Sequence, residues 1–299
     1  MKTSSFHWPP PVRPGDRVAV AAPASPVDRE AFQAGVRLLE DWGLEVVCGL
    51  EIFAERAWSA AADRALARRF HELWERQDIR AVIGARGGYG SLKVLPHLDL
   101  NALAARPRRL VGFSDLTNLL WTLHHRLGLV TFHGPNVAHL PLLTPGARED
   151  FFRWLSAAGP RQASLEGLTV IHGGQAQGLL AGGNLTTLCH LLGTPYAPRF
   201  AGYILFLEDH NEALYRLDRM VHHLLFSGAL EGVRGVVLGA FTNCDGDHRL
   251  PEVLGAALAP LQAPVLAGLP VGHQPDNYTL PLGAPVRLDG DLGCLTFLA

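Results

Sequence analysis

Three residues have the types and surroundings needed for nucleophilic catalysis, and the first of them is Ser114. Ser114 lies between the short apolar run Arg109–Gly112 and a helix-like apolar pattern that begins at Leu116. This order predicts a strand, a tight turn and a helix, with the serine hydroxyl above the sheet and the Asp115 N–H facing a developing oxyanion. The alternative is an ordinary helix N-cap, in which the serine satisfies a free N–H group.

A catalytic serine also needs a base and an orienting acid, and two later segments can supply them. Glu208 ends the apolar run Ile204–Leu207, where burying a carboxylate is costly unless it has a partner. His273 lies in a loop framed by Pro270 and Gly272, which can fix the imidazole ring. Taken singly, Glu208 could be a solvated strand end and His273 an ordinary loop histidine.

The segment Arg86–Gly90 is rich in glycine and follows a predicted strand over residues 80–85. Glycines let the backbone approach a ligand closely and expose N–H donors. The Gly88 N–H could therefore complete an oxyanion hole with the N–H of Asp115. The alternative is a plain turn between a strand and a helix.

The first half of the chain alternates apolar runs with amphipathic patterns, and the predicted helices span residues 28–42, 63–76 and 116–127. Such alternation predicts a mainly parallel sheet with right-handed crossovers. The glycine-rich segment, Ser114 and His133 would all follow carboxyl ends of strands, where sites form in these sheets. We expect domains over residues 1–140 and 177–299, the second β-rich, and a connector over 141–176.

The 299 residues are 48% hydrophobic and 18% charged with a net charge of -2, which fits one large or two ordinary domains. No basic surface indicates nucleic acid. Arg106, Arg108 and Arg109 form the densest arginine cluster, and we expect them to solvate a loop before a strand. No run is long enough for a membrane helix, and the N-terminus lacks the apolar region of a signal peptide. We therefore expect a cytoplasmic chain without membrane association.

Cofactor motifs are missing from the sequence. No GxGxxG follows the first predicted strand and no GxxxxGK[ST] occurs, which disfavours a nucleotide cofactor. The fourteen histidines show no zinc-binding spacing, and the four cysteines lie far apart without a CxxC pair. We expect no metal and no organic cofactor.

Taken in order, these motifs resemble the LD-carboxypeptidase family of serine peptidases, which includes muropeptide LD-carboxypeptidases and microcin C self-immunity peptidases. The α/β-hydrolases share the order of serine, acid and histidine, but they require glycine where this chain has Leu116. The resemblance runs nearly end to end, through residues 20–25, 85–90, 112–115, 131–135, 182–185, 193–195, 207–209, 215–220, 272–273 and 280–283.

The resemblance implies Ser114 as nucleophile, His273 as general base and acid, and Glu208 as the orienting carboxylate, with Gly88 and Asp115 N–H groups as the oxyanion hole. It implies an α/β fold, in which a Rossmann-like N-terminal domain with a parallel sheet joins a smaller β-rich α+β C-terminal domain, with the site at their junction. It also implies a homodimer.

The substrate implied by the resemblance is the L-to-D peptide bond of a murein tetrapeptide, whose cleavage releases terminal D-Ala during peptidoglycan recycling. A terminal carboxylate requires a cation or N–H donors, and Arg86 and Arg219 are the candidates. Asn184 could line the cleft. Its alternative is a turn residue with positive φ.

Two other functions remain open. The first is a peptidase of the same family that cleaves microcin-like aminoacyl nucleotides. Such members are longer and carry an extra aromatic-bearing loop, whereas the segment 141–173 is short and spaces Phe151, Phe152 and Trp154 as packing residues. The second is a non-catalytic ligand-binding protein of the same fold, which is disfavoured because all three triad positions are filled.

Overall fold

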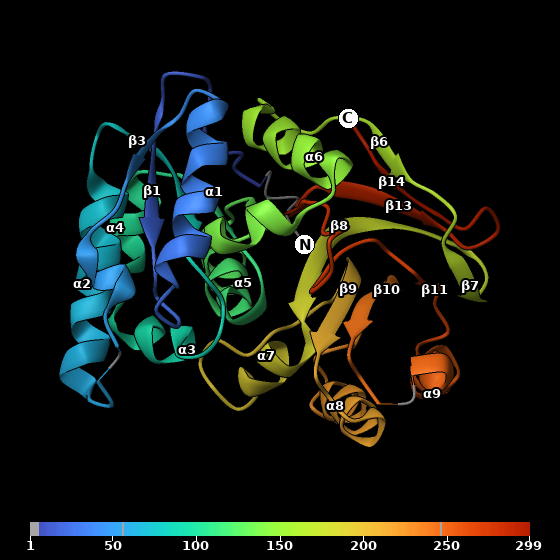
Figure 1. Ribbon diagram of the computed structural model, residues 1–299. Helices are drawn as coiled ribbons and strands as arrows, with labels where there is room; N and C mark the ends of the chain where they lie inside the picture. The colour runs from blue at the N-terminus through green and yellow to red at the C-terminus, as the bar shows by residue number, and fades with distance from the viewer. Residues whose placement is uncertain (1–5, 56, 246) are drawn as a thin grey trace. The chain divides into compact units, whose positions relative to one another are not determined.

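The computed structural model describes residues 6–55, 57–245 and 247–299, and the chain divides into two units, each built on its own sheet (Figure 1). Unit 1 contains the chain up to Ala158 together with Tyr278–Pro281, and unit 2 contains Gly159–Asn277 and Leu282–Ala299. The division falls inside the segment 141–176. Within the described ranges, no helix is both long enough and apolar enough to cross a bilayer.

Unit 1 is a parallel α/β unit. Its sheet has the strand order β12-β5-β4-β3-β1-β2, and the pairs among β1 to β5 are all parallel. The strands are β1 (Arg17–Ala21), β2 (Glu45–Val47), β3 (Ile79–Gly84), β4 (Arg109–Gly112), β5 (Thr131–His133) and β12 (Leu280–Leu282). The helices are α1 (Arg29–Asp41), α2 (Ala60–Glu75), α3 (Ser91–Val94), α4 (Leu100–Ala105), α5 (Thr117–Leu127) and α6 (Pro145–Ser156). The described part of the unit also contains the short 3₁₀ helices η1 (Leu50–Phe53), η2 (Leu95–His97), η3 (Ser114–Leu116) and η4 (Val137–Leu142).

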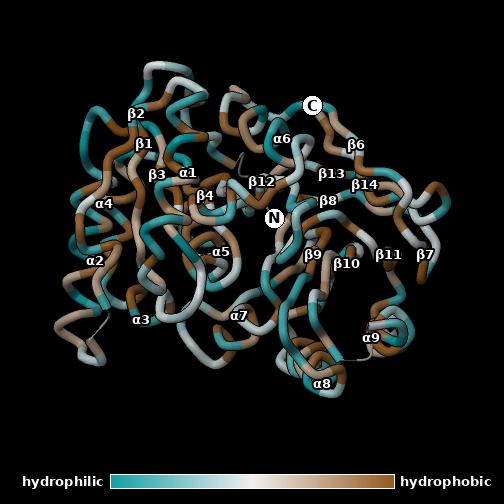
Figure 2. The backbone as a smooth tube through the Cα atoms, viewed as in Figure 1, coloured by the Kyte–Doolittle hydropathy of each residue, from teal (hydrophilic) through white to brown (hydrophobic). Residues whose placement is uncertain are grey.

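The core of unit 1 follows from the apolar strands and amphipathic helices of the sequence. Residues 18–20 of β1 and 81–83 of β3 are fully buried, and the strands appear as hydrophobic stretches in Figure 2. Helix α1 begins at Asp28, whose carboxylate accepts hydrogen bonds from two N–H groups of the first turn, and it buries Phe32 and Leu39. The Rossmann-like parallel fold expected for the N-terminal half is confirmed.

Unit 2 is a mixed unit in which strands dominate. The sheet order is β6-β14-β13-β8-β9-β10-β11-β7, with a parallel centre from β8 to β11 and antiparallel strands on both sides. The strands are β6 (Ala163–Leu165), β7 (Thr169–His172), β8 (Gln175–Asn184), β9 (Tyr203–His210), β10 (Gly235–Thr242), β11 (Val265–Ala267), β13 (Pro285–Asp289) and β14 (Cys294–Phe297). The helices are α7 (Leu185–His190), α8 (Leu214–Phe226) and α9 (Leu250–Leu258), with 3₁₀ helices η5 (Asp247–Arg249) and η6 (Ala259–Leu261). The expected β-rich α+β architecture is confirmed.

The expectation that the arginine cluster solvates a loop is wrong for Arg108 and Arg109, because both side chains are buried. The Arg109 guanidinium donates hydrogen bonds to four carbonyl oxygens, those of Pro9 (3.1 Å), Pro10 (2.9 Å), Trp154 (2.7 Å) and Ala157. Two of these carbonyls lie at the end of α6, where the helix dipole favours a cation. Burial lowers the pKa of Arg109 to about 10, which leaves it protonated at neutral pH.

Arg109→Met should therefore lower the free energy of unfolding by about 3 kcal/mol or more, because each buried carbonyl left unpaired costs about 1–3 kcal/mol. Urea denaturation of the two proteins measures the difference. Arg153→Met is the matched control, since Arg153 is exposed and pairs with Glu149 one turn away, an arrangement that contributes about 0.5 kcal/mol. If Arg109→Met and Arg153→Met lower the free energy of unfolding equally, the hydrogen bonds from Arg109 to the buried carbonyls do not stabilise the fold.

Candidate active site

Ser114 lies on a sharp turn at the carboxyl end of β4. Phe113 is extended with φ -152, and Ser114 itself has φ 63, in the left-handed region. A non-glycine residue pays about 1–2 kcal/mol for this conformation, and such strain is concentrated at functional sites. The N-cap interpretation is not supported, since the cap positions of η3 and α5 are Phe113 and Leu116, and neither makes a side-chain cap bond in the described part of the chain.

The glycine-rich loop after β3 lies against this turn, because β3 and β4 are neighbouring parallel strands. A Cβ added at Gly87 would lie 2.8 Å from Ser114 Cβ and 2.9 Å from its Oγ. Gly88 is exposed and has φ +105, which suits glycine alone. The structure thus brings the loop that carries Gly88 together with Ser114.

Asp115 ties the serine turn to the start of α3. Its carboxylate accepts a hydrogen bond from the Ser91 N–H at 2.7 Å, and its carbonyl accepts one from the Ser91 hydroxyl at 2.6 Å. Asn118 donates to the same hydroxyl at 3.0 Å. Helix α3 starts directly after the glycine-rich loop, so these bonds fix the turn and the loop against each other.

Glu208 and His273 form a hydrogen-bonded pair in unit 2. The Glu208 side chain on β9 is fully buried, and its Oε2 lies 2.7 Å from His273 Nδ1. Burial alone would lower the pKa of His273, but the hydrogen bond and charge of Glu208, with the charge of Asp209, raise it above the usual 6.5. Glu208 thus holds the imidazole through Nδ1.

The loop that carries His273 is fixed to β10 by its backbone. Ala240 N–H donates to the Val271 carbonyl at 2.8 Å, and the Gly272 N–H donates to Asn277 Oδ1 at 2.9 Å. Gly272 has φ +126, and a Cβ there would lie 2.9 Å from Glu208 Oε2. Glycine at 272 therefore lets the histidine loop approach the glutamate closely.

Asp209 follows Glu208 on β9, and its charge contributes to the raised pKa of His273. It is almost fully buried, and burial followed by the charge of Glu208 raises its pKa, while hydrogen bonds from Thr186 and the His210 N–H oppose that rise. Thr186 donates to Oδ2 through its N–H (2.9 Å) and hydroxyl (2.7 Å). Asp209 thus connects the end of β9 to the first turn of α7.

Asn184 is a capping residue in this network. It precedes α7, its Oδ1 accepts a hydrogen bond from the Thr187 N–H at 3.0 Å, and its Nδ2 donates to Asp209 at 3.0 Å. The expectation of a positive φ is wrong, because Asn184 has φ -67 and the positive angles belong to Gly182 and Gly183. Its role in lining a cleft stays a prediction.

Sequence reasoning missed His210, whose ring stacks on the His273 ring with centroids 4.8 Å apart and an angle of 8°. Burial, and then the neighbouring His273, lower the pKa of His210. A neutral, flat ring thus covers one face of His273. The only signal in the sequence is its position directly after Glu208 and Asp209, which does not reveal the stacking.

The two arginines considered for a terminal carboxylate lie in different units. Arg86 is exposed in unit 1, with Nη1 3.4 Å from the Pro26 carbonyl. Arg219 is exposed on α8 of unit 2, with its guanidinium 5.5 Å from the centre of the Tyr215 ring. Their proposed role in substrate binding stays a prediction.

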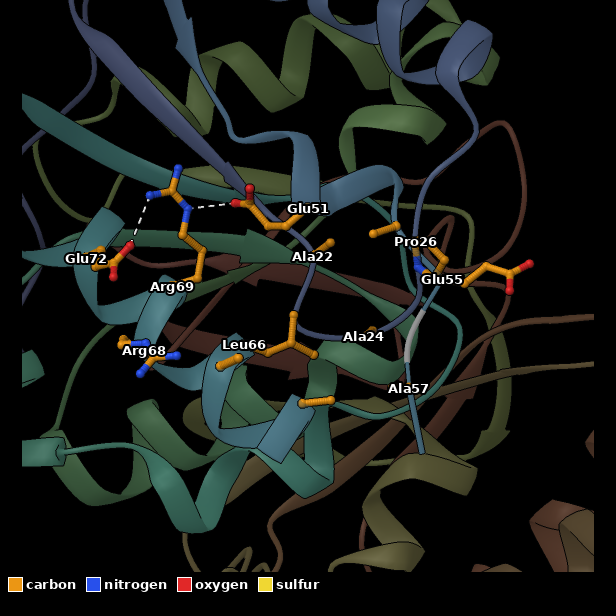
Figure 3. Close-up of a pocket in the computed structure, with 13 residues that line it drawn as sticks. Ala22, Ala24, Pro26, Glu51, Glu55, Ala57, Leu66, Arg68, Arg69 and Glu72 are labelled. Carbon is orange, nitrogen blue, oxygen red and sulfur yellow. Dashed lines mark hydrogen bonds and ion pairs between the residues drawn. The ribbon is translucent and has the colours of Figure 1, made fainter. Parts of the chain in front are cut away.

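A pocket of about 410 Å³ lies in unit 1 beside the loop that follows β1 (Figure 3). Its lining is Ala22, Ala24, Pro26, Glu51, Ala54, Glu55, Ala57, Ala62, Ala65, Leu66, Arg68, Arg69 and Glu72. Arg69 is bound by Glu51 at 2.6 Å and Glu72 at 3.1 Å, as Figure 3 shows. The lining contains neither Ser114 nor the Glu208–His273 pair, so we assign this pocket no part in the chemistry.

Comparison with known protein families identifies a peptidase. Residues 18–134 match the LD-carboxypeptidase N-terminal domain, and residues 177–288 match the LD-carboxypeptidase C-terminal domain. The chain belongs to the LD-carboxypeptidase family, as its motifs indicated.

Relatives and solved structures agree with this assignment. The chain is 37% identical to the murein tetrapeptide carboxypeptidase of Pseudomonas aeruginosa, over 92% of this chain and 94% of the relative. The crystal structure of muramoyltetrapeptide carboxypeptidase from Oxalobacter formigenes is similar with a TM-score of 0.82, at 30% identity, covering 94% of this chain and 97% of the other. MccF in complex with glutamyl sulfamoyl guanosine gives a TM-score of 0.88, at 26% identity, covering 97% and 98%.

Proposed function

We propose that this protein is a serine carboxypeptidase that hydrolyses the L-to-D peptide bond of murein tetrapeptides and releases D-Ala in peptidoglycan recycling. The observation that carries the proposal is the buried Glu208 carboxylate at 2.7 Å from His273 Nδ1. An acid held this way keeps the imidazole in one tautomer and stabilises its protonated form. The strained backbone of Ser114 at the end of a parallel strand supplies the matching nucleophile.

The reaction follows from these roles. Ser114 Oγ attacks the peptide carbonyl carbon as His273 Nε2 takes the hydroxyl proton, and the oxyanion is bound by the N–H groups of Gly88 and Asp115. His273 then gives the proton to the leaving nitrogen, so that D-Ala departs and an ester to Ser114 remains. Water, deprotonated by His273, attacks the ester and releases the tripeptide. Glu208 stays ionised throughout.

The substrate assignment is supported by the relatives. The chain is 37% identical to the murein tetrapeptide carboxypeptidase of Pseudomonas aeruginosa and 28% identical to the microcin C7 self-immunity protein of Escherichia coli. Phe151 and Trp154 are buried in α6, and Phe152 stacks on Trp42 at 4.6 Å, so these aromatic residues serve packing.

Mass spectrometry of murein tetrapeptide incubated with the protein tests the proposal. We expect tripeptide and free D-Ala, and the matched control is the same tetrapeptide ending in L-Ala, which should be cleaved far more slowly. Cleavage of aspartyl sulfamoyl adenosine with the tetrapeptide left intact would move the assignment to the microcin-type activity. If neither compound is cleaved, both proposed activities are refuted.

A further inference from the structure

One residue of the loop after β1, Ser25, binds the glycine-rich loop on both sides of Gly88. The Ser25 N–H donates to the Gly87 carbonyl at 3.3 Å, and Ser25 Oγ accepts a hydrogen bond from the Tyr89 N–H at 3.0 Å. A Cβ added at Gly88 would lie 2.3 Å from this hydroxyl oxygen. The hydroxyl therefore occupies the space beside Gly88 that any larger residue would need.

These bonds determine where the Gly88 N–H points. The Gly87 carbonyl and the Gly88 N–H belong to one planar peptide group, and in a trans peptide they point in opposite directions. The described chain has no cis peptide bond. Because the carbonyl is directed at the Ser25 N–H, the Gly88 N–H must point away from Ser25. The same loop also approaches Ser114, since a Cβ added at Gly87 would lie 2.9 Å from Ser114 Oγ.

The strand order places this contact where parallel sheets bind ligands. Strand β2 pairs with one edge of β1, and β3 pairs with the other edge, followed by β4 and β5. Crevices form at such a switch in strand order, outside the carboxyl ends of the two central strands. Ser25 follows β1 and Gly88 follows β3, so the hydrogen bonds of Ser25 to Gly87 and Tyr89 join the two loops at this crevice.

We propose that Ser25 is a positioning residue for oxyanion stabilisation, which holds the Gly87–Gly88 peptide so that the Gly88 N–H faces the carbonyl oxygen attacked by Ser114. The inference rests on the proposed function, in which Ser114 is the nucleophile and Gly88 an oxyanion donor. Donors fixed in advance stabilise a transition state without reorganisation, and a misplacement of about 1 Å can cost about 100-fold in rate. Substrate binding before the reaction does not use this donor, so Ser25 should affect kcat rather than KM.

The test compares Ser25→Ala with the wild-type enzyme on murein tetrapeptide. The variant keeps the backbone bond to the Gly87 carbonyl but removes the hydroxyl that accepts the Tyr89 N–H and fills the space beside Gly88, so the Gly87–Gly88 peptide is no longer held on both sides. We expect kcat to fall by about 10- to 100-fold, with KM changed by less than about 2-fold. A peptide boronic acid, whose tetrahedral adduct with Ser114 places an oxygen in the oxyanion site, should lose affinity by a similar factor. Ser59→Ala is the matched control, because Ser59 Oγ also accepts a backbone N–H bond, from Ala62 at the start of α2; it should leave kcat and boronate affinity unchanged.

The outcomes separate this inference from the proposed function. If the wild-type enzyme cleaves the tetrapeptide and Ser114→Ala does not, but Ser25→Ala retains full kcat and boronate affinity, the role of Ser25 is refuted while the proposed function stands. The role of Ser25 is also refuted if Ser25→Ala changes only KM. It is refuted equally if Ser25→Ala lowers only the melting temperature, which is the effect expected from removing the Ser59 cap. If the wild-type enzyme does not cleave the tetrapeptide, or Ser114→Ala cleaves it equally well, both proposals fail.

Discussion

Ser114→Ala is expected to lower kcat on the murein tetrapeptide by about 10⁴-fold or more, because no acyl-enzyme can form without the hydroxyl. The residual rate would come from the oxyanion donors and substrate positioning alone. Steady-state release of D-Ala measures the loss. Retention of more than about a tenth of the wild-type rate would exclude Ser114 as the nucleophile.

The matched control is Ser156→Ala, which removes a hydroxyl that donates to the Phe152 carbonyl at 2.9 Å at the end of α6. This variant should keep wild-type kcat. Ser114→Gly should be as inactive as the alanine variant yet unfold at no lower urea concentration, because glycine adopts φ 63 without the steric cost that serine pays. Strain kept at the expense of stability is a feature of functional sites.

Glu208→Gln is expected to lower kcat by about 10⁴-fold, close to the effect of replacing the carboxylate in other serine triads. The amide can donate to Nδ1, which places the imidazole proton on Nε2, the nitrogen that should accept the serine proton. The neutral amide also cannot stabilise the imidazolium that forms. Glu231→Gln, in the exposed loop before β10, is the control and should retain full activity.

The pH dependence gives an independent check of the same pair. The base must be neutral to accept a proton, so wild-type kcat/KM should fall as the pH drops through the pKa of His273, which lies above 6.5. Glu208→Gln removes the hydrogen bond to a carboxylate and the charge that raise this pKa. The acid limb of its residual activity should therefore move to lower pH. An unchanged acid limb in the variant would mean that Glu208 does not set the pKa of the base.

Much of the fold and of the candidate site could be predicted from the sequence because the signals are local. Apolar runs with flanking glycine and proline predicted strands β1 to β5 of unit 1, and their alternation with amphipathic helices predicted a parallel sheet. The same local order placed Ser114 on a turn after β4 and the glycine-rich loop after β3. The order of motifs along the chain then identified the family.

Contacts between distant segments decided the rest. The sequence could not show that Arg109 is buried, because its carbonyl partners come from Pro9, Pro10 and the end of α6. Glu208 and His273 are 65 residues apart, and their contact depends on a glycine at 272 that lets the loop approach β9. A hydrogen bond or a stacked ring between elements depends on distances of a few tenths of an ångström, which no periodicity in the sequence specifies. The sequence by itself thus determined which residues have side chains suited to catalysis, and only the tertiary structure decided that Glu208 holds His273 and that Ser25 binds the loop of Gly88.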